Sequence, residues 1–410
     1  MTTVAPVDAD ALLAELVATP EGRADPYPRY ALLRAQAPVH RSMFGFWTLT
    51  RYDDCQYLLR HPGVGKDFAG AASRLGLTDE MLAEQARFRN DHSNMLVSDP
   101  PDHTRLRGLV TRAFTPRTVE TLRPRIVALV DQLLDRFGPG EVDVMDELAF
   151  PLPVTVIGDM LGVPAEDWPR LRPLVRSVTA VLELVITSED MAAATAADVA
   201  LVEYFAGLVA ERRAHPGDDL LSHLIAAEAD GDQLSEHELI STAILLFAAG
   251  FETTTHLIGN GLLALLRNPG QLDRLRADRG LLRPAVEELL RYDSPVQMAA
   301  RTAYEDLTIG GVRIEAGSVV LALLGAANHD PAHFSDPDRL DVGRAEGAPI
   351  SFGGGIHFCL GAALARMEGQ IVLDRLLDRF STVELVDDRP THRDSLTLRG
   401  LVDLRVRFAA

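Results

Sequence analysis

The sequence contains few cysteines and no long uncharged apolar run. Its 410 residues include two cysteines, Cys55 and Cys359, whose contexts are unrelated and give no hint of a disulfide framework. No stretch of about 18 uncharged apolar residues occurs, so we expect no membrane-spanning helix. The first 30 residues have neither a basic n-region nor a long apolar h-region. Together these features predict a cytoplasmic protein.

Positive charge is also scarce. The chain has 40 Lys and Arg residues against 59 Asp and Glu, and the only lysine is Lys66, so its formal net charge is −19. This balance argues against long-range attraction to nucleic acid or to an anionic membrane surface. An apolar content of 47% with 24% charged residues is typical of a globular chain with a large core. We therefore expect a monomer that binds neither nucleic acid nor a membrane.

The pattern along the chain predicts a mainly α fold with small β-sheets (α+β). Alternation and β-branched residues indicate strands near 38–52, 307–324 and 396–408. Apolar residues at three- and four-residue spacing make 101–268 the helix-rich part. We find no internal repeat, linker or charge run that would mark a boundary, and therefore expect a single domain over 1–410.

One predicted helix is unusually long. Ser235 and Glu238 have the spacing of a capping box, and apolar residues continue to Asn268, which makes a helix of about 45 Å. Its middle, AAGFETTT at Ala248–Thr255, contains a glycine, three consecutive threonines and the charged Glu252. A surface-facing stripe is one explanation. The apolar flanks favour burial, and a buried helix that departs from local preferences is where function is expected.

The second unusual segment is SFGGGIHFCLGAALARME at Ser351–Glu368. As a nucleophile, Cys359 has His357 nearby as a base but no evident third group to orient it. A phosphate-binding loop would need the lysine and hydroxyl that are absent here. Structural zinc and iron–sulfur clusters need further cysteines. A single axial thiolate to haem iron remains, because haem needs only one strong protein ligand on that side.

The local sequence suits an axial thiolate. A helix beginning at about Leu360 would place Cys359 at its N-terminus, where the helix dipole lowers a thiol pKa. Gly353, Gly354 and Gly355 would let the backbone turn tightly beside a flat macrocycle, and Gly361 would let the helix start lie close to it. A small buried cysteine after a flexible turn is the alternative for an isolated residue.

The whole pattern F-G-x-G-x-H-x-C-x-G-x-x-L-A-R is present. Its members are Phe352, Gly353, Gly355, His357, Cys359, Gly361, Leu364, Ala365 and Arg366. With further landmarks over nearly the whole chain, it resembles the cytochrome P-450 superfamily of haem-thiolate monooxygenases in its soluble bacterial form. The resemblance implies one helix-rich triangular domain, with haem b between the Cys359 loop and the long distal helix. It makes Cys359 the metal ligand and Phe352 and Gly353 cofactor-binding residues.

Other family landmarks assign further residues. In EELLRYDSPV, Glu288 and Arg291 match the buried structural Glu-x-x-Arg pair, although most such spacings are exposed helical pairs. In DPPDHTRLR, His103 and Arg107 match the residues that hold a haem propionate. Arg301 and His357 match the remaining propionate positions. Singly, each of these would more often be a surface residue.

The AAGFETTT segment matches the oxygen-binding helix of the family. The resemblance gives Ala249 and Gly250 an oxygen groove, and Glu252 and Thr253 the acid–alcohol pair that delivers protons. Departures such as Phe251 in place of a histidine put the shape of the pocket in doubt rather than the reaction class. The candidate walls of the substrate pocket are Leu96, Ala248, Phe251, Val296, Met298 and Leu398.

The implied activity is insertion of one oxygen atom from O2 into an apolar small molecule, by hydroxylation or epoxidation. A secondary metabolite, polyketide, terpenoid or steroid-like compound is the expected substrate. The chain has no flavin or iron–sulfur motif, so two electrons would come from NAD(P)H through a ferredoxin reductase and a ferredoxin. Arg105, Arg107, Arg112 and Arg117 lie in a segment without acidic residues that would attract an acidic ferredoxin, unless the cluster is a chance one.

Three alternatives stay open. A peroxide-driven haem-thiolate peroxygenase would share the cysteine pattern but would not need Glu252 and Thr253. A non-catalytic haem sensor or carrier would not need the groove at Gly250. A cysteine-nucleophile hydrolase would contain no haem at all.

Overall fold

The computed structural model describes residues 8–68, 94–138, 140–184, 186–229 and 232–409. The chain divides into two compact units, each assembled from three stretches. Unit 1 consists of Met1–Phe88, Arg267–Cys359 and His392–Gly400. Unit 2 consists of Arg89–Leu266, Leu360–Thr391 and Leu401–Ala410. The Cys359 loop therefore belongs to unit 1, and the long helix with its Glu252–Thr253 pair belongs to unit 2.

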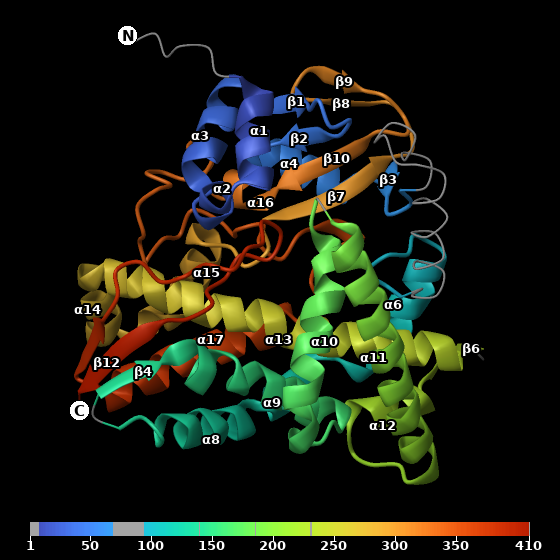
Figure 1. The fold of residues 1–410 in the computed structure, drawn as a ribbon, viewed down its shortest axis with the longest axis vertical. Coiled ribbons are helices and arrows are strands. Elements are labelled where there is room, and N and C mark those ends of the chain that lie inside the picture. Colours follow the sequence, from blue (N-terminus) through green and yellow to red (C-terminus); the bar gives the residue numbers. More distant parts are fainter. Residues whose placement is uncertain (1–7, 69–93, 139, 185, 230–231, 410) are drawn as a thin grey trace. The chain divides into compact units, whose positions relative to one another are not determined.

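Unit 1 is built on a five-stranded sheet (Figure 1). Its order is β1 (Val39–Arg41), β2 (Trp47–Leu49), β10 (Val319–Leu323), β7 (Met298–Ala303) and β3 (Val64–Gly65). A separate hairpin joins β8 (Leu307–Ile309) to β9 (Val312–Ile314). Strand β10 pairs in parallel with β2 and antiparallel with β7, and all five of its residues are buried, as expected for a central strand. The strands predicted near 38–52 and 307–324 are confirmed.

Unit 1 also contains helices, which come from the first two of its three stretches. They are α1 (Ala9–Ala18), α2 (Pro20–Ala24), α3 (Tyr27–Gln36), α4 (Tyr52–Arg60), α14 (Pro269–Ala277), α15 (Leu282–Tyr292) and α16 (Leu324–Ala327). Helix α4 packs against β10, and its buried Tyr52, Cys55, Leu58 and Leu59 belong to the same hydrophobic cluster as the sheet. This packing matters for the site because α4 also supports the Cys359 loop.

Unit 2 is mainly helical. Its helices are α6 (Asp102–Ala113), α7 (Pro116–Thr121), α8 (Arg123–Leu134), α9 (Pro151–Leu161), α10 (Trp168–Thr179), α11 (Ser188–Ala214), α12 (Leu220–Ala226), α13 (Glu236–Arg267, of which Arg267 counts with unit 1) and α17 (Ala362–Arg379). Within the helix-rich part predicted over 101–268, α7 ends at Thr121 and α8 begins at Arg123, with Pro124 in its first turn. Minor strands β5 (Glu228–Ala229) and β6 (Asp232–Gln233) precede α13.

The long helix α13 is as the capping box predicts. The Ser235 N–H donates to Glu238 Oε2 at 2.9 Å, and the Glu238 N–H donates to Ser235 Oγ at 3.2 Å. The 32-residue helix then runs to Arg267, with most of its residues buried. The buried residues include Ala248, Phe251, Glu252, Thr254 and Thr255 of AAGFETTT, which favours burial over a surface-facing stripe.

A three-stranded sheet in unit 2 corrects one prediction. It has the order β11 (Thr382–Leu385), β12 (Arg405–Ala409) and β4 (Gly140–Asp143). Of the strand predicted near 396–408, only the part from Arg405 is in a strand, and Leu398 forms a single β-bridge with Val296. The reason lies in Arg399, whose buried guanidinium donates to Asp293 at 2.6 Å and to backbone carbonyls of α2, which holds this segment as a loop.

Within the described residues, one helix passes a length and composition test for a membrane span. This helix is α11, whose Leu201, Phe205 and Val209 are buried in the hydrophobic cluster of unit 2. A buried core helix passes the same test, so α11 gives little support for a span.

Candidate active site

The Cys359 loop is a tight backbone turn in unit 1. The Cys359 N–H donates to Phe352 O at 3.0 Å, and the Gly353 N–H donates to Ile350 O at 2.8 Å. Gly353 and Gly355 have φ angles of 71° and 65°, in the left-handed region that glycine adopts without strain. The glycine-rich sequence is therefore required by the turn itself.

The glycines also let the loop lie directly on α4. A Cβ atom on Gly355 would be 2.2 Å from the backbone oxygen of Leu59, and one on Gly354 would be 3.3 Å from Leu59 Cβ. This contact explains both residues without the predicted approach to a macrocycle. A Cβ atom on Gly361, by contrast, would meet no atom of the described residues within 4 Å. The surroundings of Gly361 therefore leave room beside the start of α17.

The start of α17 differs from the prediction. The helix begins at Ala362 with Gly361 as its N-cap, two residues later than the expected start at Leu360. The reason is that Leu360 and Gly361 form a turn. Cys359 therefore precedes the N-cap by two residues rather than lying directly before the first residue of the helix.

Cys359 is the accessible cysteine. Cys359 is exposed, whereas Cys55 is buried in α4 and its thiol donates to Leu49 O at 3.3 Å. Burial raises the pKa of the Cys55 thiol well above its usual value, which opposes ionisation there. The side chains of Ile356 and Phe358 beside Cys359 are 50% and 42% exposed. A thiol among exposed apolar side chains fits the face of a large, flat, apolar group.

The donor set fits haem in particular. Among the described residues there is no group of three or more His, Cys, Asp and Glu side chains placed to hold a metal ion. A single thiolate suits a metal whose remaining equatorial ligands come from its own macrocycle. Haem has such a ring, so Cys359 would be its protein ligand.

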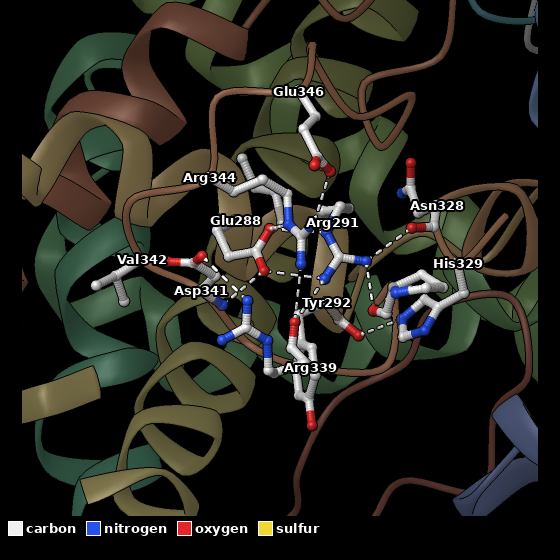
Figure 2. Close-up of polar contacts among 12 residues, drawn as sticks. Glu288, Arg291, Tyr292, Asn328, His329, Arg339, Asp341, Val342, Arg344 and Glu346 are labelled. Atoms are coloured by element: carbon white, nitrogen blue, oxygen red, sulfur yellow. Dashed lines mark hydrogen bonds and ion pairs between the residues drawn. The ribbon is translucent and has the colours of Figure 1, made fainter. Parts of the chain in front are cut away.

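A buried charge cluster in unit 1 contains the predicted Glu288–Arg291 pair (Figure 2). Arg291 Nε donates to Glu288 Oε2 at 2.7 Å and Nη2 donates to Oε1 at 2.9 Å, which is a bidentate pair. Arg344 Nε donates to the same Glu288 Oε2 at 3.0 Å and pairs with Glu346. Glu288 and Arg291 are 2% and 1% exposed, so the alternative of an exposed helical pair is wrong.

The same cluster fixes the segment that follows α16. Arg291 Nη1 donates to Asn328 O at 2.8 Å and to Pro337 O at 2.7 Å, and the Asp341 N–H donates to Glu288 Oε1 at 2.9 Å. Burial alone would raise the pKa of Asp341, but its bonds to Arg274 and to backbone hold that pKa below the usual value. The cluster therefore fastens α15 to residues 328–346.

Four predicted site residues lie on β7 or beside it. Val296 pairs with Leu398 through the isolated bridge, and Met298 begins β7. Arg301, in the middle of β7, is 3% exposed and donates from Nη1 to Ala300 O at 2.8 Å. The structure thus brings the candidate pocket residues Val296 and Leu398 together, although they are about 100 residues apart in the sequence.

In unit 2, α13 presents the predicted acid–alcohol pair. Thr253 Oγ1 donates to Ala249 O at 3.0 Å, one turn earlier, and both residues are partly or fully exposed. Glu252 is 4% exposed and lies on a different face. A Cβ on Gly250 would be 2.8 Å from Ile157 of α9, so helix packing accounts for this glycine independently of the predicted oxygen groove.

Two further candidate residues of this helix are buried. Phe251 packs edge-on against Phe150 and Phe247 in the core of unit 2. Ala248 is 8% exposed, whereas Leu96, which precedes α6, is 40% exposed. The contacts of Phe251 are those of a core side chain.

Sequence reasoning missed two residues that contact Glu252. His256 Nε2 is 3.5 Å from Glu252 Oε2, and Arg176 Nε of α10 is 3.9 Å from Glu252 Oε1. The i, i+4 spacing of Glu252 and His256 was a usable signal for the first. No sequence signal pointed to Arg176.

The predicted propionate residues of unit 2 lie on α6. His103 is buried and Arg107 is half-buried, one helical turn apart. Arg105, between them, forms an ion pair with Glu238 and so ties α6 to the start of α13. Arg112 and Arg117 are exposed on α6 and α7. His357 of the Cys359 loop, in unit 1, is half-buried.

Comparisons with known proteins agree with the geometry. Residues 188–402 match the family model "Cytochrome P450". The chain is 47% identical over 398 residues to cytochrome P450 107B1 of Saccharopolyspora erythraea, which covers 94% of this chain and 96% of that protein. It is 40% identical to the polyketide biosynthesis cytochrome P450 PksS of Bacillus subtilis. That match covers 94% of this chain and 96% of that protein.

Solved structures show the same likeness. The PksS structure matches with a TM-score of 0.86 over 96% of this chain and 100% of that chain, at 38% identity. P450BioI, solved in complex with acyl carrier protein carrying hexadec-9Z-enoic acid, matches with a TM-score of 0.88 at 37% identity. That match covers 95% of this chain and 99% of that chain.

Proposed function

This chain belongs to the cytochrome P450 family and is a haem-thiolate monooxygenase, and we propose that it oxidises an apolar secondary metabolite and that Cys359 would provide the thiolate ligand. The observation that carries the choice of ligand is the contrast between the two cysteines. Cys359 is exposed on a glycine turn, whereas Cys55 is buried and donates its thiol to a backbone carbonyl. When bound, the haem supplies the activation of O2. The chain's own residues hold it and provide protons.

The chain offers arginine and histidine side chains for the two haem carboxylates. In unit 1 these are Arg301 and His357, and in unit 2 His103 and Arg107. All four are buried or half-buried, where a positive charge gains most from an anionic partner. Thr253 presents a hydroxyl with acceptor capacity beyond its bond to Ala249, and Glu252 is its neighbour for proton transfer. These features favour the O2- and NAD(P)H-dependent reaction over a peroxygenase, sensor or hydrolase.

Replacing Cys359 by serine should abolish the red-shifted Soret band that thiolate-bound haem shows when reduced and bound to carbon monoxide. The reason is that a serine hydroxyl does not provide the thiolate electron density that causes the shift. Cys55→Ser is the matched control and should keep the band. An unchanged spectrum in Cys359→Ser would overturn the assignment of the ligand.

The substrate we propose is an apolar polyketide, terpenoid or steroid-like molecule, hydroxylated or epoxidised in the cytoplasm. Val296, Met298 and Leu398 support it, because they bring three apolar side chains into one part of unit 1. The similarity to PksS, which is named for polyketide biosynthesis, points to the same class. Titration of such compounds against the haem-loaded protein, followed by the spin-state change in its absorption, tests this proposal.

A ferredoxin is the proposed electron donor, reduced by an NAD(P)H-dependent reductase. Arg112 and Arg117 are exposed, in a chain of net charge −19. Arg105 is the weakest member of the predicted patch, since Glu238 neutralises it. An acidic ferredoxin would be steered to the remaining arginines.

Arg112→Glu should slow reduction by an acidic ferredoxin about ten-fold at low ionic strength, because it reverses a charge in the steering field. High salt should remove the difference, since screening shortens the range of the field. Stopped-flow reduction of the haem measures both. Arg405→Glu, at an exposed position of β12, is the matched control. Equal salt dependence for Arg112→Glu and wild type would contradict the proposed docking surface.

A further inference from the structure

Helix α13 carries three buried polar residues at intervals of one turn. Glu252, His256 and Asn260 are 4%, 2% and 1% exposed, and they occupy positions i, i+4 and i+8 of the helix. Residues at this spacing lie on the same face. Burying such groups is unfavourable unless they interact. A row of ionisable and amide side chains inside a mostly apolar helix therefore calls for a role.

The Glu252 carboxylate is contacted on both of its oxygens. His256 Nε2 is 3.5 Å from Oε2, and Arg176 Nε is 3.9 Å from Oε1. The Arg176 side chain is 47% exposed, whereas the side chains of Glu252 and His256 are 5% and 3% exposed. Glu252 thus has a solvent-exposed cation on one side and a buried imidazole on the other.

His256 is also a neighbour, on helix α13, of Thr253, the other member of the predicted acid–alcohol pair. It is three residues from Thr253 and four from Glu252, so both lie within one turn of it on the helix surface. Thr253 keeps its hydroxyl on the more exposed side of the helix, bonded to Ala249 O. His256 is therefore placed between the buried acid and the side of the helix that carries the alcohol.

We propose that His256 is a positioning residue that holds the Glu252 carboxylate for proton delivery toward Thr253, in opposition to Arg176. An imidazolium at His256 stabilises the carboxylate that Glu252 leaves behind when it gives up a proton. When His256 is replaced, Arg176 is the one that remains of these two contacts, and it draws the Glu252 carboxylate toward the surface. This inference rests on the proposed function, since it presumes that Glu252 and Thr253 deliver protons.

An NMR titration of the histidine rings tests the coupling directly. In the haem-loaded, reduced, carbon monoxide-bound protein, Glu252→Gln should lower the titration midpoint of the His256 imidazole, because it removes an adjacent negative charge. Arg176→Gln should raise it. His223 is the matched control, because it lies at the same 3.5 Å from Asp218 but is exposed. A His256 midpoint that is the same in wild type and Glu252→Gln overturns the proposal.

A second measurement separates this inference from the proposed function. The assay contains ferredoxin, reductase and NAD(P)H but no added substrate, and it measures the hydrogen peroxide released per NAD(P)H consumed. This ratio should rise in Thr253→Ala and in His256→Leu. The peroxide released should rise less in His256→Gln, because glutamine keeps a polar contact to Glu252. If Thr253→Ala releases no extra peroxide, the acid–alcohol assignment fails. If Thr253→Ala does release more and both His256 variants match wild type, only the role of His256 fails. The titration in Glu252→Gln needs no His256 variant, so poor folding of such variants leaves the test intact.

Discussion

Replacing Arg291 by leucine is expected to lower the free energy of unfolding by about 3 to 5 kcal/mol, the usual effect of removing one partner of a buried ion pair. Arg291 is 1% exposed and forms a bidentate pair with Glu288. Its loss leaves the Glu288 carboxylate with Arg344 as its remaining charged partner in the cluster of Figure 2. The carbonyls of Asn328 and Pro337 also lose a donor. Urea unfolding followed by circular dichroism measures the change.

The chain provides a matched control for this effect. Arg123 and Glu120 form an ion pair at the same i, i+3 spacing, but their side chains are 43% and 60% exposed. Arg123→Leu should change stability little, because solvent screens an exposed pair. Arg291→Lys keeps the charge but not the planar guanidinium that forms two parallel bonds. Its loss of stability should lie between those of Arg291→Leu and Arg123→Leu. A loss below about 1 kcal/mol in Arg291→Leu would show that the cluster does not stabilise unit 1 in the way its geometry suggests.

Glu368→Gln is expected to remove a large pH dependence of stability. Glu368 lies on α17, is 1% exposed, and its Oε2 has no hydrogen-bond partner among the described residues. Burial raises the pKa of this carboxyl from 4.5 to about 8. Since the folded-state pKa is the higher one, the stability that Glu368 contributes is fully present below about pH 4.5 and is lost as the pH rises to about 8. At about 1.4 kcal/mol per pKa unit, the loss amounts to about 5 kcal/mol.

The difference between the two proteins isolates Glu368. All other titrating groups are shared, so their contributions cancel when the free energies of unfolding are subtracted at each pH. Between pH 5.5 and 8, Glu368→Gln should gain about 3 kcal/mol relative to wild type. Glu203→Gln, on the exposed side of α11, should give a flat difference. A flat difference for Glu368→Gln as well would mean that the carboxyl ionises freely in the folded protein.

Sequence signals that depend on a few neighbouring residues predicted the local structure. The Ser235–Glu238 capping box and the apolar run behind it located α13 almost to the residue, because a helix end depends on contacts within one turn. Alternation failed at 396–404, since a strand also needs a partner. There the backbone is held by Arg399 and by the single bridge from Leu398 to Val296. Which segments pair is a property of the whole fold.

In the candidate site, too, features set by the local sequence could be predicted, whereas contacts between distant segments could not. The cysteine motif identified Cys359 because its pattern is local and complete. It did not predict that Gly354 and Gly355 pack on Leu59, since that contact joins residues almost 300 positions apart. Arg176 beside Glu252, and Arg344 beside Glu288, are likewise contributed by other elements. Spacing could have suggested His256, which shares the helix of Glu252.

The middle position of β12 in its sheet has a consequence for the order of events on the ribosome. Strand β4 is made first, at residues 140–143, and β11 at 382–385, but the two do not pair with each other. Each pairs only with β12, at residues 405–409. A nascent chain must therefore carry β4 with its edges unsatisfied while more than 250 further residues are added. Completion of this sheet is a late, long-range step, which favours slow folding of unit 2.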